Sequence, residues 1–516
     1  MKALQFIVHS FLVTALLASP AASGQDAVRL GLEQSIISAI ENNLDIAVQR
    51  AKPKAGEKDV IQLESEFDTS LFGGLSYAKT QTPSLSPLSS PAVGESATST
   101  ASVGFQQKLT LGTTYKLTAD LNQTDTNSSY AGVNPQYSNN LELAVTQPLL
   151  KGMGRDVNSS RIVIAQNTKQ MSEEDLAAKV MDIVTQTQET YWDLVYLNGQ
   201  LEVQIESLER AKDFKKQVET KVELGVLAPI EVTSAEATIA VREQSLIGIR
   251  QSIFNAQDKL EMLMNRKDLP LGSPVAIVPT DPPVYKDVPL GIGQLLEAAY
   301  ENRPECRQSQ LAIESKRNEL AFNKNQLYPS VDLNGSVKLK GVRGSGRTVI
   351  FNGQPVVSNL AGGQGDAFGD MAGGKFYDYS VGVSVAYLLS NRSAKSKVAK
   401  SMIELDADEM SLASLRQQVE MQVLTAARDV EASGQSIQAS HASSVLSAKK
   451  LEAENSKYKV GASTSFLVLQ YQNDLASAQS AEIKAATDYL KALARLEKAT
   501  GTVLQKHNIT IAQQDK

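Results

Sequence analysis

Two long stretches of the chain place apolar residues at a mean spacing of about 3.5 positions. The first covers 159–223 and the second covers 396–459. This spacing is typical of a coiled-coil seam, so both stretches are predicted to be long helices. Each is followed by a tight turn and a second patterned segment, at 229–265 and 465–500, which we expect to be a return helix.

A helix as long as 159–223 does not fit inside a single compact domain. About 65 helical residues span roughly 97 Å at the α-helical rise. Another helix is predicted at 32–65, and together with the return helix it matches the long helix in length. We therefore expect a rod or a tube of mixed α and β class, mainly α.

Four shorter segments alternate apolar and polar residues, at 71–77, 141–146, 331–339 and 379–387. Runs near ten residues with this period match transmembrane β-strands. A soluble β-subdomain with one wetted face shows the same period, so the strand pattern alone leaves that alternative open.

The segments around these predicted strands differ between the two halves of the chain. The stretches 80–100 and 341–374 are rich in Pro, Ser and Gly, as long external loops are. Segments 102–109 and 113–122, joined at Leu111-Gly112, resemble an additional hairpin without a counterpart in the second half. The pattern leaves open whether this hairpin joins the other strands or forms a separate flap.

Parts of the sequence occur twice, in the same order. Segment 32–43 resembles 292–303, and Val222–Gly225 resembles Tyr458–Gly461. We infer two structural repeats joined by a proline-rich extended linker. The predicted division is a signal peptide at 1–23, a first repeat at 24–267 with its strand segment at 67–150, a linker at 268–290, a second repeat at 291–501 with its strand segment at 328–389, and a C-terminal tail at 502–516.

The first residues are predicted to be a targeting signal. A basic end at Lys2, an apolar run and small residues at 19–23 are typical of a secretory signal peptide, which we expect to be cleaved. No run of about 18 apolar residues follows, so the mature chain is expected to be soluble or held in a membrane by a β-barrel. The single cysteine, Cys306, suits a bacterial periplasmic or outer-membrane setting.

Composition argues against several function classes. The 516 residues contain 51 Lys plus Arg and 57 Asp plus Glu, and this net charge of −6 argues against nucleic acid as a partner. One cysteine and three widely separated histidines, His9, His441 and His507, leave no predicted metal site and no catalytic set. We therefore predict neither enzymatic activity nor a cofactor.

Over nearly its whole mature length the chain resembles the TolC-type outer-membrane efflux proteins, or outer membrane factors. The motifs that carry the resemblance are Glu41-Asn42 and Glu301-Asn302, Leu327-Tyr328-Pro329, Gln147-Pro148-Leu149-Leu150, and the helix-turn-helix tips at 224–232 and 460–469. The resemblance implies a homotrimer in the bacterial outer membrane that extends into the periplasm. Each protomer is expected to give about four strands to a shared 12-stranded β-barrel and its helices to a long α-helical barrel.

The implied function is that of an exit duct for tripartite efflux or type I secretion, with passive passage of the substrate. Outer-membrane lipid, a periplasmic adaptor and an inner-membrane transporter are the implied partners. The strand count independently favours assembly, because four strands cannot close a pore alone; the number three comes from the resemblance. The alternative is an exported periplasmic adaptor or coiled-coil scaffold without a pore.

The turns at the two hairpin tips form the predicted docking surface. Gly225 and Gly461 follow the long helices and suit a left-handed C′ conformation, whereas Pro229 suits the first turn of a return helix. Ser463 or Thr464 suits the cap of the other return helix. The resemblance implies that an adaptor docks at Gly225, Val226, Leu227, Ala228, Pro229, Gly461, Ala462, Ser463 and Thr464.

Two more sets of residues are expected to serve a channel. Family members carry an acidic ring after the second tip glycine, but Leu467 and Gln470 occupy those places here. The candidates for a pore constriction are Glu231, which alternatively is an acid favoured by the helix dipole, and Tyr458, which alternatively is a packing residue. Interfacial aromatic side chains are predicted at Tyr77, Phe376, Tyr377, Tyr379 and Tyr387.

Overall fold

The computed structural model describes residues 27–83, 91–286, 288–351 and 353–510. The predicted signal peptide at 1–23 and the last six residues of the predicted tail lie outside these described residues. The chain divides into two compact units, which are described separately. Of the described residues, those within 1–47, 179–302 and 420–516 form the helical unit, and those within 48–178 and 303–419 form the strand unit. The class is mixed α and β, mainly α, as predicted.

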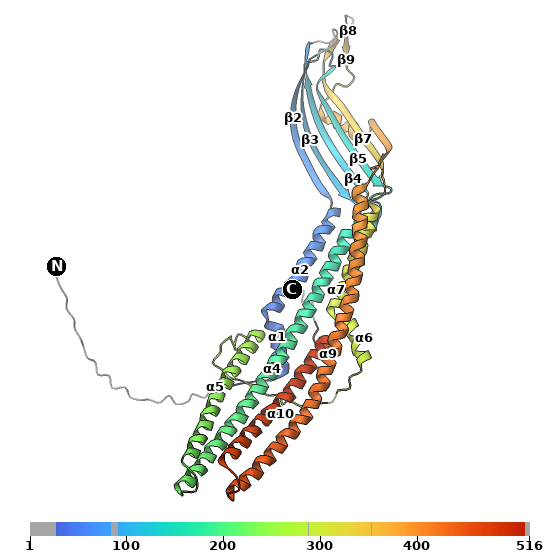
Figure 1. Ribbon diagram of the computed structural model, residues 1–516. Coiled ribbons are helices and arrows are strands. Elements are labelled where there is room, and N and C mark those ends of the chain that lie inside the picture. Colours follow the sequence, from blue (N-terminus) through green and yellow to red (C-terminus); the bar gives the residue numbers. More distant parts are fainter. Residues whose placement is uncertain (1–26, 84–90, 287, 352, 511–516) are drawn as a thin grey trace, which may run out of the picture. The chain divides into compact units, whose positions relative to one another are not determined.

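Four helices lie side by side in the helical unit, in the order α5, α4, α10, α9 (Figure 1). Ion pairs join each neighbouring pair, as Lys215–Glu236, Lys491–Asp193 and Lys450–Asp474 show. Predicted seam residues of α4, among them Val180, Leu194, Ala211 and Val218, are buried because they face the other helices. The bounds are α4 Ser160–Glu223, α5 Ile230–Met264, α9 Arg392–Lys459, α10 Ser465–Thr500 and α11 Val503–Lys506.

A short parallel pairing fixes the start of the described chain to the linker. Strand β1, Val28–Leu30, pairs with β6, Ile277–Pro279. The Tyr191 hydroxyl of α4 donates to Asp281 Oδ2 at 2.6 Å and lies 3.1 Å from the Leu30 carbonyl oxygen. The linker 268–290 is therefore partly strand, and its apolar residue Ile277 packs in the core with Tyr191 and Leu260.

The helix predicted at 32–65 is interrupted. The structure has α1, Leu32–Asn42, and α2, Leu44–Glu64, with Asn43 in an extended conformation between them. The Asn43 side chain accepts from the backbone N–H of Asp45 at 2.9 Å and donates to the Leu263 carbonyl at 3.0 Å. An asparagine that caps the second helix in this way ends the first. In the second repeat, the extended residue Arg303 separates α6, Ile292–Asn302, from α7, Pro304–Asn325, because a residue before proline disfavours helical backbone.

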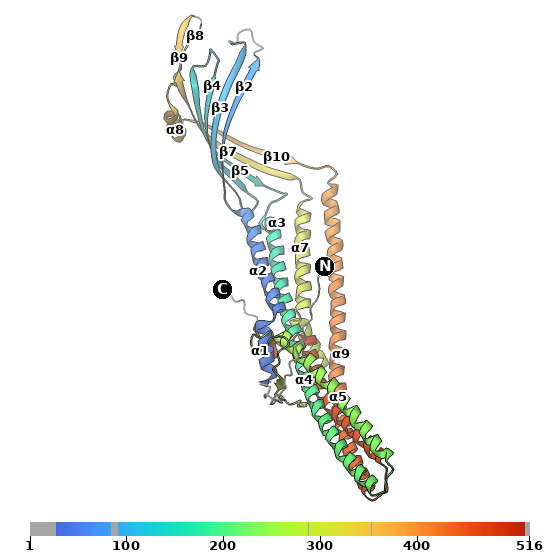
Figure 2. The same cartoon turned by 90° about the vertical axis from the view of Figure 1, so that its left-hand side faces the viewer.

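The strand unit contains one six-stranded sheet with the order β10-β7-β5-β4-β3-β2 (Figures 1 and 2). All neighbouring strands are antiparallel. The bounds are β2 Ser70–Pro83, β3 Val93–Lys108, β4 Thr114–Thr126, β5 Val133–Pro148, β7 Ser330–Gly346 and β10 Phe376–Ala386. The prediction of about four strands is therefore too low.

The two additional strands, β3 and β4, come from the hairpin whose role the sequence left open. They lie between β2 and β5 in the sheet, so the hairpin joins the other strands. The loop predicted at 80–100 is wrong for residues 80–83 and 93–100. Strand β2 continues to Pro83, and β3 begins at Val93. Serine and threonine, which suggested a loop, alternate here with apolar residues along a strand.

The second predicted loop, 341–374, also contains regular structure. Residues 341–346 continue β7, and β8, Thr348–Phe351, pairs with β9, Gln354–Val357. Helix α8, Gln364–Ala372, packs on the sheet. The short helices η1, Ser65–Phe67, and α3, Arg155–Asn158, complete the described elements of this unit. None of the helices in the described residues is both long and apolar enough to cross a membrane.

Candidate functional site

The register of the sheet sorts its side chains into two faces. Residues opposite each other in neighbouring strands share a face, and successive residues of a strand alternate. Val103 of β3 lies opposite Ala119, which lies opposite Leu141, and the same row continues to Leu339 and Tyr377. Apart from the start of β5, where the register shifts between Val133 and Gln136, the odd-numbered residues of the six strands therefore lie on one face and the even-numbered residues on the other.

The odd-numbered face, called the apolar face here, is hydrophobic across every strand. Its large side chains are mostly exposed, with 87% of Leu75 and 77% of Val381 accessible to solvent. Val331 to Leu339 covers about 26 Å along β7, or about 20 Å in height at a strand tilt of about 40°, against the apolar band about 25 Å tall of outer-membrane barrels. The face carries Leu71, Leu75 and Tyr77 of β2, Ala101, Val103 and Phe105 of β3, Tyr115, Leu117, Ala119 and Leu121 of β4, Leu141, Leu143 and Val145 of β5, Val331, Leu333, Val337 and Leu339 of β7, and Tyr377, Tyr379, Val381, Val383 and Val385 of β10.

The even-numbered face, called the polar face here, carries hydroxyl, amide and charged groups. Cross-strand contacts link them, such as Thr100 to Asn122 at 2.8 Å and Ser336 to Ser380 at 2.8 Å. The charges balance, because Lys108, Lys116, Lys338 and Lys340 stand against Asp120, Glu142, Asp332 and Asp378. Glu142 and Lys338 form an ion pair at 3.2 Å. Such a face suits water, whereas the opposite face suits hydrocarbon.

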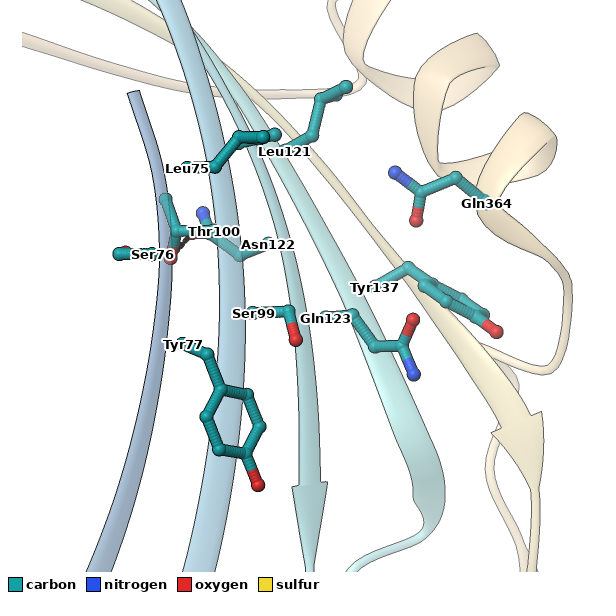
Figure 3. A pocket seen from close by; sticks show the side chains of 11 residues that line it. Leu75, Ser76, Tyr77, Ser99, Thr100, Leu121, Asn122, Gln123, Tyr137 and Gln364 are labelled. Atoms are coloured by element: carbon teal, nitrogen blue, oxygen red, sulfur yellow. Dashed lines mark hydrogen bonds between the residues drawn. The ribbon is translucent and has the colours of Figure 1, made fainter.

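The apolar face becomes polar near α8. Asn139 exchanges hydrogen bonds with Gln364, and Arg343 forms a two-pronged ion pair with Asp370, with its shortest contact at 2.6 Å. Arg343 holds the pKa of the Asp370 carboxyl below its usual range through these hydrogen bonds. A groove of about 690 Å³ lies beside the helix and is lined by Tyr77, Gln123, Tyr137 and Gln364 (Figure 3). Mixed aromatic and amide side chains of this kind are typical of a membrane interface.

The predicted interfacial aromatic residues do not all lie on the same face of the sheet. Tyr77, Tyr377 and Tyr379 lie on the apolar face, which is compatible with the prediction. Phe376 lies opposite Lys340 on the polar face, so it does not share a face with Tyr377 and Tyr379. It immediately precedes Tyr377, and alternation forces the two rings to opposite faces. Tyr387 follows the end of β10 and is exposed.

Both hairpin tips have the predicted glycine geometry. Gly225 and Gly461 have φ of 73° and 79°, and the N–H of the next residue returns to a carbonyl five residues back, Val226 to Lys221 and Ala462 to Lys457. These bonds close the ends of α4 and α9 as in a Schellman motif. Thr464 caps α10 by accepting from the Leu467 N–H at 3.4 Å.

The other tip residues differ in exposure and capping. Pro229 has helical backbone angles and directly precedes α5. Leu227 packs against the apolar cluster of the tips. Val226 and Val460 are strongly exposed. Ser463 donates a hydrogen bond of 2.5 Å to Glu454, which is buried.

The two constriction candidates occupy different environments. Tyr458 is only 3% exposed, lies 5.1 Å from the Phe214 ring, and has Lys221 Nζ 3.7 Å from its ring centroid. Its ring is part of the tip core, which is the packing role that the sequence left open as the alternative to a pore constriction. A heptad pattern does not distinguish an aromatic that packs between helices from one that faces a lumen. Glu231 lies half-exposed in the first turn of α5.

Sequence reasoning missed several residues that the structure brings into these surfaces. Tyr137 and Gln364 at the groove, and Asn139 under α8, lay outside the predicted strand cores. Strands β3 and β4 carry full apolar and polar faces. The sequence predicted parts of both strands, at 102–109 and 113–122, but missed that β3 begins at Val93.

Comparison with known proteins identifies the class. A model of the outer membrane efflux protein family matches residues 108–266 and 295–502. The matched segments cover well over half of the chain, which therefore belongs to the outer membrane efflux protein family and confirms the resemblance. Proteins of this family are non-enzymatic pore proteins. No curated protein sequence matches the chain.

Solved structures of outer-membrane channels share the fold. The outer-membrane channel OprN is 15% identical, with 92% of this chain and 90% of that chain covered and a TM-score of 0.64. VceC from Vibrio cholerae is 14% identical, with 91% and 96% covered and a TM-score of 0.62. The open state of MtrE from Neisseria gonorrhoeae is 17% identical, with 96% and 97% covered and a TM-score of 0.60.

Proposed function

We propose that this protein is the outer-membrane exit duct of a tripartite efflux or type I secretion system. The observation that carries the proposal is the two-faced sheet, which exposes hydrocarbon-compatible side chains on one side and water-compatible side chains on the other. Its family membership supports a channel over an adaptor or scaffold. Substrates would pass passively along the polar face, whose hydroxyls, amides and balanced charges suit water.

A single chain leaves both edges of this sheet unpaired. In the described residues β2 and β10 each have one neighbouring strand in the sheet. Unpaired edges of long strands are costly in lipid and prone to pair with other strands. Because six antiparallel strands alternate in direction, β2 and β10 run oppositely, so β2 of one copy can pair antiparallel with β10 of the next. We propose closure by three copies, the number implied by the resemblance, in a barrel with the apolar face toward lipid.

The hairpin tips are proposed to dock a periplasmic adaptor, which links the duct to an inner-membrane transporter. Support comes from the apolar side chains that the tips expose, among them Val226, Ile230, Val460 and Phe466. Crosslinking from cysteines placed at these tips, followed by identification of the captured protein, tests the docking. The chain itself is proposed to reach the outer membrane after its signal peptide is cleaved, which N-terminal sequencing of the mature protein tests.

Three copies of Glu231 are proposed to form a cation-attracting constriction. The residue stands at the start of α5, beside the exposed tip. Replacing it by glutamine removes the charge and keeps the shape, so cation selectivity should fall in Glu231→Gln channels. Glu236→Gln, one turn further along α5, is the control, because Glu236 is paired with Lys215 at 2.9 Å. If Glu231→Gln channels and unaltered channels had equal cation selectivity, Glu231 would not form the proposed constriction.

Reconstitution tests the proposed function as a whole. The mature protein should fractionate with outer membrane, be extracted only by detergent, and give discrete conductance steps in planar bilayers. A protein that is extracted by buffer and leaves bilayers silent would instead be an adaptor or a scaffold.

A further inference from the structure

We infer that the β3–β4 hairpin is part of the membrane wall, so that three copies close an eighteen-stranded barrel instead of the twelve-stranded barrel implied by the resemblance. This inference rests on the proposed trimeric channel. It concerns the width of the passage and therefore the size of the solutes that it admits.

Strands β3 and β4 are long enough to cross the hydrocarbon core of a membrane. Strand β3 has 16 residues and β4 has 13. About 9–11 residues are enough to cross the hydrocarbon core at the usual tilt. Both strands are hydrogen-bonded on both sides within the sheet, β3 to β2 and β4, and β4 to β3 and β5. A flap outside the wall would leave β2 and β5 paired with each other.

The polarity of the hairpin matches that of the neighbouring strands. Val103 and Phe105 of β3 and Leu117 of β4 lie on the apolar face, in register with Leu71 and Leu143. Ser102 and Thr118 lie on the polar face. A soluble flap has no reason to continue the apolar face across its whole width, whereas a lipid-facing wall requires it.

The addition of two strands by the hairpin still allows the barrel to close between copies. A hairpin adds two strands, so the strands that flank it keep their directions and their faces. The edges β2 and β10 therefore still run oppositely and pair between copies as they would without the hairpin. Inserting a single strand would instead make both edges parallel and prevent an all-antiparallel ring.

The consequence is a much wider passage through the membrane. With strands about 4.8 Å apart and tilted by about 40°, eighteen strands close at a backbone diameter of about 36 Å, against about 24 Å for twelve. The cross-section inside the backbone rises more than twofold. The membrane segment would thus admit bulkier solutes than a twelve-stranded barrel does.

Site-directed spin labelling tests the inference in the full-length protein. Single cysteines replace Val103 and Ser102 in β3, and Leu117 and Thr118 in β4, in a Cys306→Ser background reconstituted into lipid vesicles. Labels at Val103 and Leu117 should be relaxed mainly by oxygen, which concentrates in lipid. Labels at Ser102 and Thr118 should be relaxed mainly by a water-soluble nickel chelate. The mass of the protein particle in detergent should equal three chains.

A matched pair on β10 separates the inference from the function on which it rests. Val381 lies on the apolar face and Ser380 on the polar face of a strand that any barrel of this family would use. If β10 shows the alternation and the four hairpin sites all favour the nickel chelate, the hairpin is a flap and the inference is overturned. If Val381 also fails to contact lipid, the proposed channel itself is overturned. A particle of two chains would give twelve strands and would also overturn the inference.

Discussion

The two repeats of this chain use the same helices but different numbers of strands. Each repeat has an interrupted opening helix and a long helix that turns at a left-handed glycine, Gly225 or Gly461. The first repeat gives β2, β3, β4 and β5 to the large sheet, whereas the second gives only β7 and β10. Between β7 and β10 the second repeat carries β8, β9 and α8 instead.

This difference shows where the fold tolerates change. A helix layer held by a continuous apolar seam does not accept an inserted helix without repacking both neighbours. An antiparallel sheet accepts a hairpin, because two strands restore the direction and the face of the strand that follows. The width of the sheet is therefore free to vary in steps of two strands.

The largest effect is expected from a charge on the apolar face of the inserted hairpin. In the proposed barrel, Val103→Lys would place an ammonium group toward lipid in β3, at a cost of about 2–4 kcal/mol in each copy if the residue lies near the bilayer centre. Ser102→Lys, the adjacent residue on the polar face, should change stability by less than about 1 kcal/mol. Urea unfolding from lipid vesicles measures the difference. Equal losses for the two variants would contradict the assignment of the faces.

A smaller effect is expected from a change that obstructs the β2–β3 pairing. A Cβ at Gly104 would lie 2.5 Å from both the Phe72 ring and the Leu117 carbonyl oxygen. Gly104→Val should therefore destabilise the sheet by about 1–3 kcal/mol. Gly382→Val is the matched control, because Gly382 also lies on the polar face and has open space at its Cβ. The same urea titration compares the two variants. If Gly104→Val were as stable as Gly382→Val, the packing between Gly104 and Phe72 would not be rigid.

The smallest effect is expected at the tips that the two repeats share. Gly461 has φ of 79°, so Gly461→Ala should cost about 1–2 kcal/mol of local stability. Gly461→Asn should cost less, since asparagine adopts left-handed backbone more readily. Hydrogen–deuterium exchange of the tip peptides reports the opening of this turn. Unaltered exchange in Gly461→Ala would mean that the turn does not depend on its glycine.

The periodic features of this fold were predictable and the local exceptions were not. The spacing of apolar residues found the four long helices, and the motifs around Gly225 and Gly461 found their turns. The interruption at Asn43 depends on a hydrogen bond to Leu263, far away in sequence. The three-residue strands β1 and β6 are too short to show a period.

The number of strands in the sheet was underestimated because of the amino-acid composition of β3. Strand β3 is rich in Ser, Thr and Gly, residues that are common in loops but also suit the water-facing side of a membrane strand. The face of Phe376 was not predictable, because the sequence does not decide which of the adjacent residues Phe376 and Tyr377 lies on the apolar face. The sequence left the role of Tyr458 open because its environment depends on Phe214 and Lys221 from another helix.

The proposed closure of the barrel between copies is tested most directly by a single-particle reconstruction of the detergent-purified protein after its transfer to lipid nanodiscs. We expect a closed ring in which β2 of each copy is hydrogen-bonded to β10 of the next, with the polar face around a water-filled bore. Copies whose sheets stay open at β2 and β10, or whose apolar faces point into the bore, would contradict it.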